Sequence, residues 1–141
     1  MNKGIANFDY YNPTHIVFGK DRIAELVTLI PVDKKVLVLY GGGSVERFGT
    51  LKRVREALSG HTFGEFGGIE ANPTYATLVR AIEQVRQEGY NYLLAVGGGS
   101  VIDGTKFVAA GALFDSEPIN IFGSGIGEGI PIKEHCRLGL F

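Results

Sequence analysis

The sequence predicts an α/β fold with a Rossmann-like parallel sheet and helices on its faces. Two short apolar runs, residues 35–40 and 91–96, lack the polar–apolar alternation of a half-exposed strand, which indicates strands buried on both faces. Each run leads into the same residues, Gly-Gly-Gly-Ser-Val. Segments with apolar residues at helical spacing follow the strands, and this order is typical of a parallel sheet with right-handed crossovers.

The composition limits the classes of protein to consider. The 141 residues suit one domain, and 45% hydrophobic with 21% charged residues is enough for a packed core. The formal net charge of −1 gives no general attraction to nucleic acid or an anionic membrane, and we expect neither as a partner. Because Cys136 is the only cysteine and no long apolar run is present, we expect no disulfide within the chain, no membrane span and a cytoplasmic location.

An extended segment and a short helix precede the first predicted strand. Residues 10–19 are rich in aromatic and β-branched residues, and Pro13 restricts them to an edge position. This segment either pairs with a partner chain or packs as a strand on its own domain. Residues 21–30 carry apolar residues at helical spacing, and we expect Asp21 to cap this helix and Pro31 to follow its end.

Two further helical regions and one strand lie between the two apolar runs. Residues 44–59 predict one helix, or two helices broken at Gly49. Residues 61–66 predict a short strand. Asn72 and Pro73 are the expected cap and first turn of the next helix, because Asn accepts hydrogen bonds from helix N–H groups and Pro needs none.

Two glycine-rich segments are the strongest functional signal. We call residues 41–44 the first glycine loop and residues 97–100 the second. Glycines leave backbone N–H groups uncovered, and a helix that starts at Ser100 adds free N–H groups and the positive end of its dipole. Because both loops follow strands, we expect them at the carboxyl edge of the sheet, where open α/β folds bind ligands. The prediction is a nucleotide-binding site; the alternative is a pair of flexible turns.

The first glycine loop also indicates which dinucleotide binds. Sites selective for NAD place an Asp or Glu after an early strand, where it holds the ribose 2′-hydroxyl. Here no acid follows the strand until Glu46, whereas the Ser44 hydroxyl, backbone N–H groups and Arg47 could hold a 2′-phosphate. We therefore predict a preference for NADP(H) over NAD(H).

Four segments of the chain carry a family resemblance. They read NPTHIVFG, YGGGSV, FGGIEANP and AVGGGSVIDGTKF, at residues 12–19, 40–45, 66–73 and 95–107. Together they resemble the iron-containing (group III) alcohol dehydrogenases, in particular the NADPH-dependent aldehyde reductases called butanol dehydrogenases. The resemblance covers residues 8–131 in order, and it is weaker to the glycerol-type dehydrogenases and dehydroquinate-synthase-type lyases of the same fold.

The resemblance implies a dehydroquinate-synthase-like fold, in which a nucleotide-binding domain precedes a helical domain that binds a divalent metal, iron or zinc. It implies hydride transfer between NADP(H) and a small aldehyde or alcohol, in a homodimer. It places the pyrophosphate at the second glycine loop, the adenosine ribose at the first, and Asp103 near the nicotinamide. The expected cofactor-binding residues are Gly41, Gly42, Gly43, Ser44, Asn72, Pro73, Gly97, Gly98, Gly99, Ser100 and Asp103.

The chain departs from the family pattern after Pro131. We expect residues 1–131 to form the NADP-binding domain, residues 132–141 to be an atypical tail, and the helical metal-binding domain to be absent, through either a fragment or a changed reading frame. The histidines that match none of the family's metal ligands are His15, His61 and His135. We expect neither catalytic nor metal-binding residues here. The chain is then part of an NADP(H)-dependent alcohol dehydrogenase or, alternatively, a nucleotide-binding fragment without turnover.

Overall fold

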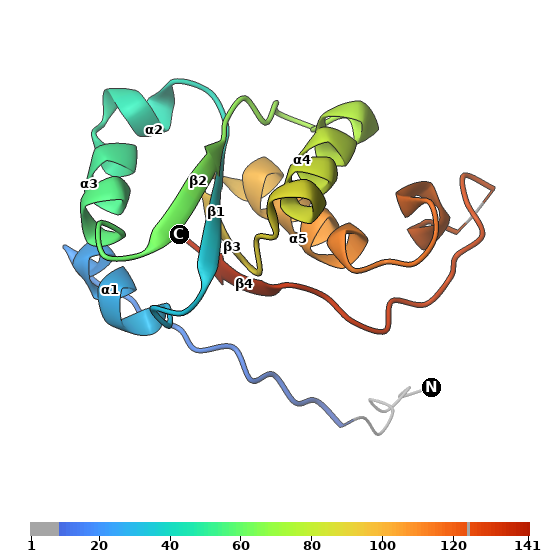
Figure 1. Cartoon of the computed structure of the whole chain (residues 1–141), viewed down its shortest axis with the longest axis horizontal. Helices are drawn as coiled ribbons and strands as arrows, with labels where there is room; N and C mark the ends of the chain where they lie inside the picture. The colour runs from blue at the N-terminus through green and yellow to red at the C-terminus, as the bar shows by residue number, and fades with distance from the viewer. Residues whose placement is uncertain (1–8, 124) are drawn as a thin grey trace, which may run out of the picture.

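The computed structural model describes residues 9–123 and 125–141, which form a sheet with helices on both faces (Figure 1). The strands are β1 (Lys35–Tyr40), β2 (Thr62–Phe66), β3 (Tyr92–Val96) and β4 (Arg137–Leu140). Within the described ranges the strand order is β2-β1-β3-β4, and every neighbouring pair is parallel. The predicted α/β class and parallel sheet are confirmed.

The two central strands, β1 and β3, are the buried centre of the fold. The inner residues of β1 and all residues of β3 are buried. Successive side chains of β1 enter two different cores: Leu37 and Leu39 lie in one, and Val36 and Val38 in the other. Because both faces of these strands are covered, neither face needs polar residues, which explains the missing alternation in the sequence.

Helices cover the two faces of the sheet in separate groups (Figure 1). On one face lie the 3₁₀ turn η1 (Arg22–Glu25) and the helices α1 (Leu26–Leu29), α2 (Ser44–Arg47) and α3 (Thr50–Ala57). On the other face lie α4 (Tyr75–Glu88) and α5 (Gly99–Ala112), and the 3₁₀ turn η2 (Pro118–Ile121) follows α5. Two glycines let α5 approach α4 closely: a Cβ at Gly104 would lie 3.0 Å from Leu78 Cδ2, and one at Gly111 would overlap Ile82.

Two predicted helix caps are wrong. Asp21 has a left-handed φ of 57° and makes no side-chain capping bond; its carboxylate lies 3.4 Å from Arg53 Nη1 instead. Asn72 also has a left-handed φ, 53°, whereas a capping residue needs extended backbone. Thr74 meets that requirement with φ −77° and ψ 152°, and its Oγ1 accepts a hydrogen bond from the Thr77 N–H at 3.3 Å.

Of the two alternatives for the segment after the first glycine loop, the structure shows two helices broken at Gly49. Gly49 has a φ of 72°, a conformation that side chains disfavour, and it separates α2 from α3. The chain therefore changes direction there, and α3 alone carries the buried residues Leu51 and Val54.

The extended N-terminal segment forms no strand in the structure. Residues 10–18 have no regular secondary structure, and Tyr11 and Phe18 are 85% and 95% exposed. The alternative in which this segment packs on its own domain is therefore not what the structure shows. Pairing with a partner chain stays a prediction.

The last residues of the chain join the sheet. Residues 132–141, which we expected to be a tail outside the nucleotide-binding domain, include β4, and β4 pairs with β3. Cys136 is buried in the core that contains α5, and its N–H donates to the Ala109 carbonyl at 3.0 Å. The predicted boundary at residue 131 thus does not coincide with the end of the sheet. No helix among the described residues has the length and apolar character to cross a bilayer.

Candidate functional site

The carboxyl ends of β1 and β3 lie next to each other, and the chain leaves them in opposite directions. From β1 it continues to α2 and α3 on one face, and from β3 to α5 on the other (Figure 1). In an open parallel sheet this reversal creates a crevice outside the strand ends, where ligands bind. The first glycine loop follows β1 and the second follows β3, so the two loops flank that position.

The second glycine loop presents free backbone donors. Gly97 has a φ of 151°, its N–H donates to the Phe141 carbonyl at 2.9 Å, and a Cβ there would lie 3.0 Å from Val101 Cγ2. Gly98 and Gly99 face open space, because a Cβ at either would meet no atom within 4 Å. The N–H groups of Gly98, Gly99 and Ser100 find no acceptor among the described residues, as expected where a helix begins. Gly97 therefore shapes the loop, and the next three residues offer N–H groups to an anion.

The first glycine loop is held at one end and open at the other. A Cβ at Gly41 would lie 3.1 Å from the Ile69 carbonyl oxygen and 3.3 Å from Val101 Cγ2. The Gly41 carbonyl accepts a hydrogen bond from the Gly68 N–H at 3.1 Å. Gly42 and Gly43 face open space, and Ser44 is exposed at the start of α2. The Val101 side chain thus lies close to the first residue of each loop, Gly41 and Gly97.

Two more predicted residues lie against the second glycine loop. The Asn72 N–H donates to Ser100 Oγ at 3.3 Å. Pro73 packs on α5, since a Cβ at Gly104 would lie 3.4 Å from Pro73 Cγ. The structure thus brings Asn72 and Pro73 to the first turns of α5, although neither caps α4.

Asp103 lies one turn along α5 from Ser100 and points into solvent. Its side chain is 79% exposed and forms an ion pair with Lys106 at 3.9 Å. No hydrogen bond joins this carboxylate to either glycine loop among the described residues.

A polar cluster beside the first glycine loop was not foreseen. Arg55 of α3 holds both carboxylate oxygens of Glu65, with Nε at 2.6 Å from Oε1 and Nη2 at 2.8 Å from Oε2. The Tyr40 hydroxyl donates to Glu65 Oε2 at 3.3 Å. The hydrogen bonds from Arg55 lower the pKa of Glu65, and burial together with the Glu65 charge raises the pKa of Tyr40. The sequence shows an acid, Glu65, near the end of β2. Its partner Arg55 on α3 could be identified only once the fold was known.

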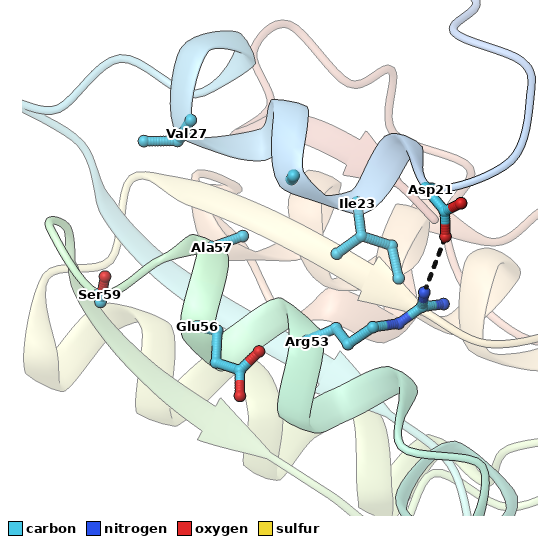
Figure 2. A pocket seen from close by; sticks show the side chains of 8 residues that line it. Asp21, Ile23, Val27, Arg53, Glu56, Ala57 and Ser59 are labelled. Carbon is cyan, nitrogen blue, oxygen red and sulfur yellow. Dashed lines mark hydrogen bonds and ion pairs between the residues drawn. The ribbon is translucent and has the colours of Figure 1, made fainter.

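Two hollows in the described part of the chain lie away from the glycine loops. One, of about 490 Å³, lies between α1 and α3, with the Asp21–Arg53 ion pair at one end and Val27, Ala57 and Ser59 further along (Figure 2). The other, of about 300 Å³, is lined by residues 113–116, 130–131 and 133–134. Neither is lined by a residue of the glycine loops, and we place the candidate site at the open edge between those loops.

The described residues do not fit a metal site. No group of three His, Cys, Asp or Glu side chains that could hold a metal ion occurs in residues 9–123 and 125–141. His61 is buried, with Nε2 at 2.9 Å from the Ile30 carbonyl, and His135 Nδ1 lies 2.9 Å from the Cys136 carbonyl. Burial raises the pKa of the Cys136 thiol, which disfavours the thiolate that a metal would need.

Comparison with protein families assigns the chain. The family described as iron-containing alcohol dehydrogenase matches residues 13–136. The chain belongs to this family. The resemblance seen in the four sequence segments is thereby confirmed, and the glycine loops of the structure are those of an iron-containing alcohol dehydrogenase.

Relatives in the family are similar in sequence and in fold. NADPH-dependent aldehyde reductase YqhD of Escherichia coli is 51% identical over 135 residues, which are 94% of this chain and 34% of that protein. Its crystal structure matches with a TM-score of 0.88 at 48% identity, over 95% of this chain and 34% of that one. NADP-dependent alcohol dehydrogenase 3 of Entamoeba histolytica is 40% identical over 121 residues, 83% of this chain and 31% of that protein.

The name of one relative of known structure gives NADH as its cofactor. The structure of NADH-dependent butanol dehydrogenase A from Thermotoga maritima has a TM-score of 0.88 at 35% identity, over 95% of this chain and 34% of that one. This chain therefore spans about a third of the length of these relatives. Because their names include both NADPH and NADH, family membership alone leaves the choice of cofactor to the site itself.

Proposed function

We propose that the crevice between β1 and β3 binds NADP(H). The observation that carries this proposal is the row of free N–H groups at Gly98, Gly99 and Ser100, on the edge where the two glycine loops meet. A pyrophosphate accepts hydrogen bonds from such groups and is favoured by the positive end of the α5 dipole. The first glycine loop then receives the adenosine ribose.

The surroundings of the first glycine loop support the choice of NADP(H) over NAD(H). An NAD-selective site uses a free carboxylate to hold the ribose 2′-hydroxyl. Here the carboxylate of Glu65 is already occupied by Arg55 and Tyr40. Ser44 and the exposed glycine N–H groups remain as donors for a 2′-phosphate, with Arg47 one turn further along.

The activity we propose for the whole enzyme is NADP(H)-dependent alcohol dehydrogenation and aldehyde reduction. Bound NADPH supplies a hydride from its nicotinamide to a small aldehyde. In this proposal the chain contributes residues that bind the cofactor: the second glycine loop binds the pyrophosphate, and Asp103 lies toward the nicotinamide. A cytoplasmic homodimer belongs to the same proposal, and the exposed residues Tyr11 and Phe18 are available for contact between subunits.

Calorimetric titration of the chain with NADPH tests the site. We expect the fold to tolerate Gly99→Ala, because a Cβ there meets no atom within 4 Å and Ala has a higher helix propensity than Gly. The added methyl group would, however, occupy space that the proposed site gives to the phosphate. We expect affinity to fall about tenfold, the cost of about one displaced hydrogen bond to a charged group. Gly60→Ala is the matched control, since Gly60 is exposed and equally open. Equal binding by both variants would show that the loop is only a turn.

An activity assay separates the two functions proposed for the chain. With NADPH, butyraldehyde and Zn²⁺ or Fe²⁺, we expect the chain to bind cofactor without consuming it. Loss of NADPH absorbance above a protein-free blank would show that a metal site forms from residues to which we assign no such role.

A further inference from the structure

We propose that Arg55 is a positioning residue for cofactor selection: by holding the carboxylates of Glu65 and Glu46 it keeps them from the ribose 2′ position. This inference rests on the proposed binding of NADP(H). It assigns part of the selectivity for NADPH over NADH to a residue of α3 that lies outside both glycine loops and outside the four family segments.

The contacts of Arg55 carry the argument. Its guanidinium forms the two short bonds to Glu65, and its Nη2 also lies 3.8 Å from Glu46 Oε1. Glu65 is only 24% exposed at its side chain, whereas Glu46 is 57% exposed. A planar guanidinium that binds a carboxylate through two parallel bonds fixes its orientation as well as its charge. Glu65 is therefore held, and Glu46 is partly neutralised.

The position of Glu65 makes its orientation matter. In the sheet Glu65 is opposite Val38, whose side chain enters the core on the α3 side, so Glu65 faces that side as well. The first glycine loop leads to α2 on the same side. Tyr40, which donates to Glu65, directly precedes Gly41. A carboxylate released from Arg55 would therefore have the first glycine loop beside it.

The chemistry then sets the sign of the effect. A free carboxylate accepts a hydrogen bond from the ribose 2′-hydroxyl of NADH and repels the 2′-phosphate of NADPH. A carboxylate held by Arg55 is paired with a positive charge and fixed in orientation, so both effects are weakened. An acid that could hold the ribose of NADH is thus present near the end of β2, but it is bound by Arg55. The sequence alone does not reveal this ion pair.

The test measures the dissociation constants of NADH and NADPH by calorimetry and compares their ratio between the wild-type chain and three variants. Arg55→Gln should lower the preference for NADPH about fivefold, the size expected for one uncompensated charge near a phosphate at the protein surface. The double variant Arg55→Gln with Glu65→Gln should return the ratio to within about twofold of the wild type, because the released carboxylate is removed. Arg53→Gln is the control: it removes an equal charge from α3, but at the ion pair with Asp21.

The outcomes separate this inference from the proposed function. If the wild type binds NADH as tightly as NADPH, the proposed cofactor preference fails. If the wild type prefers NADPH but folded Arg55→Gln keeps the same ratio, or the double variant stays as low as Arg55→Gln, the inference fails alone. Circular dichroism shows whether each variant folds. If Arg55→Gln does not fold, the ratio of the two dissociation constants is measured for Arg55→Lys instead. Lys keeps the charge without binding both oxygens, so a partial shift supports the inference and an unchanged ratio overturns it.

Discussion

The two glycine loops share the sequence Gly-Gly-Gly-Ser-Val, but the structure gives them different surroundings. The second loop begins a 14-residue helix, α5, whose buried face packs on the sheet and on α4. The first loop begins α2, which has four residues and ends before Gly49. The second loop is supported by apolar contacts, and the first has the partly buried polar cluster of Tyr40, Glu65 and Arg55 beside it. Identical sequences thus lead into different local structures, in line with the different roles that we propose for them, pyrophosphate binding for the second loop and ribose binding for the first.

The largest expected effect comes from Gly97, where the second loop has least freedom. Gly97→Ala places a Cβ 3.0 Å from Val101 on a backbone with φ 151°. We expect a loss of about 2 kcal/mol in the free energy of unfolding, the usual cost of such strain. Gly42→Ala in the first loop is the matched variant and should change stability little, since it meets open space. Urea denaturation measures both, and equal losses would remove the contrast between the loops.

Val101 is the side chain that joins the two loops, and its removal should cost slightly less. Val101→Ala deletes two buried methyl groups from a residue that is 5% exposed. We expect about 1.5 kcal/mol of lost stability from the transfer of these groups. Because both loops lose a contact, NADPH affinity should fall as well. Val45→Ala, on α2 and only partly buried, is the comparison variant. An effect of Val101→Ala on stability without any effect on binding would show that the loops are positioned independently.

The smallest effect is a pH dependence of stability that comes from the Glu65–Arg55 pair beside the first loop. Hydrogen bonds from Arg55 lower the pKa of Glu65 below the usual glutamate value of about 4.5, so the pair contributes stability that is complete above that pH. This contribution is lost as the pH falls through the lowered pKa, when Glu65 takes up a proton. From pH 5, where the contribution is complete, down to about pH 3, the urea midpoint of the wild type should therefore fall more steeply than that of Glu65→Gln. Parallel curves would mean that the ion pair adds nothing to stability.

The sequence allowed much of the local structure to be predicted. Unbroken apolar runs identified β1 and β3, because a strand covered on both faces needs no polar side. Gly49 identified the break between α2 and α3, since glycine accepts a left-handed φ. The caps at Asp21 and Asn72 were wrong, because a suitable side chain caps a helix only where its backbone is extended.

Residues distant in the sequence were harder to predict. Residues 137–140 are a short stretch with a central glycine, and they form a strand because β3 offers them an uncovered edge. Glu65 looked like an ordinary residue of a mixed strand until α3 placed Arg55 against it. Both results depend on contacts that no local pattern encodes.

By itself the sequence determined the class of fold, the two glycine loops and the family, because these follow from local periodicity, glycine backbone freedom and recognisable motifs. Only the tertiary structure decided that the loops flank the reversal between β1 and β3, that Val101 touches both, and that Glu65 is held by Arg55. The physical reason is that strand order and side-chain pairing are set by packing between segments far apart in the chain.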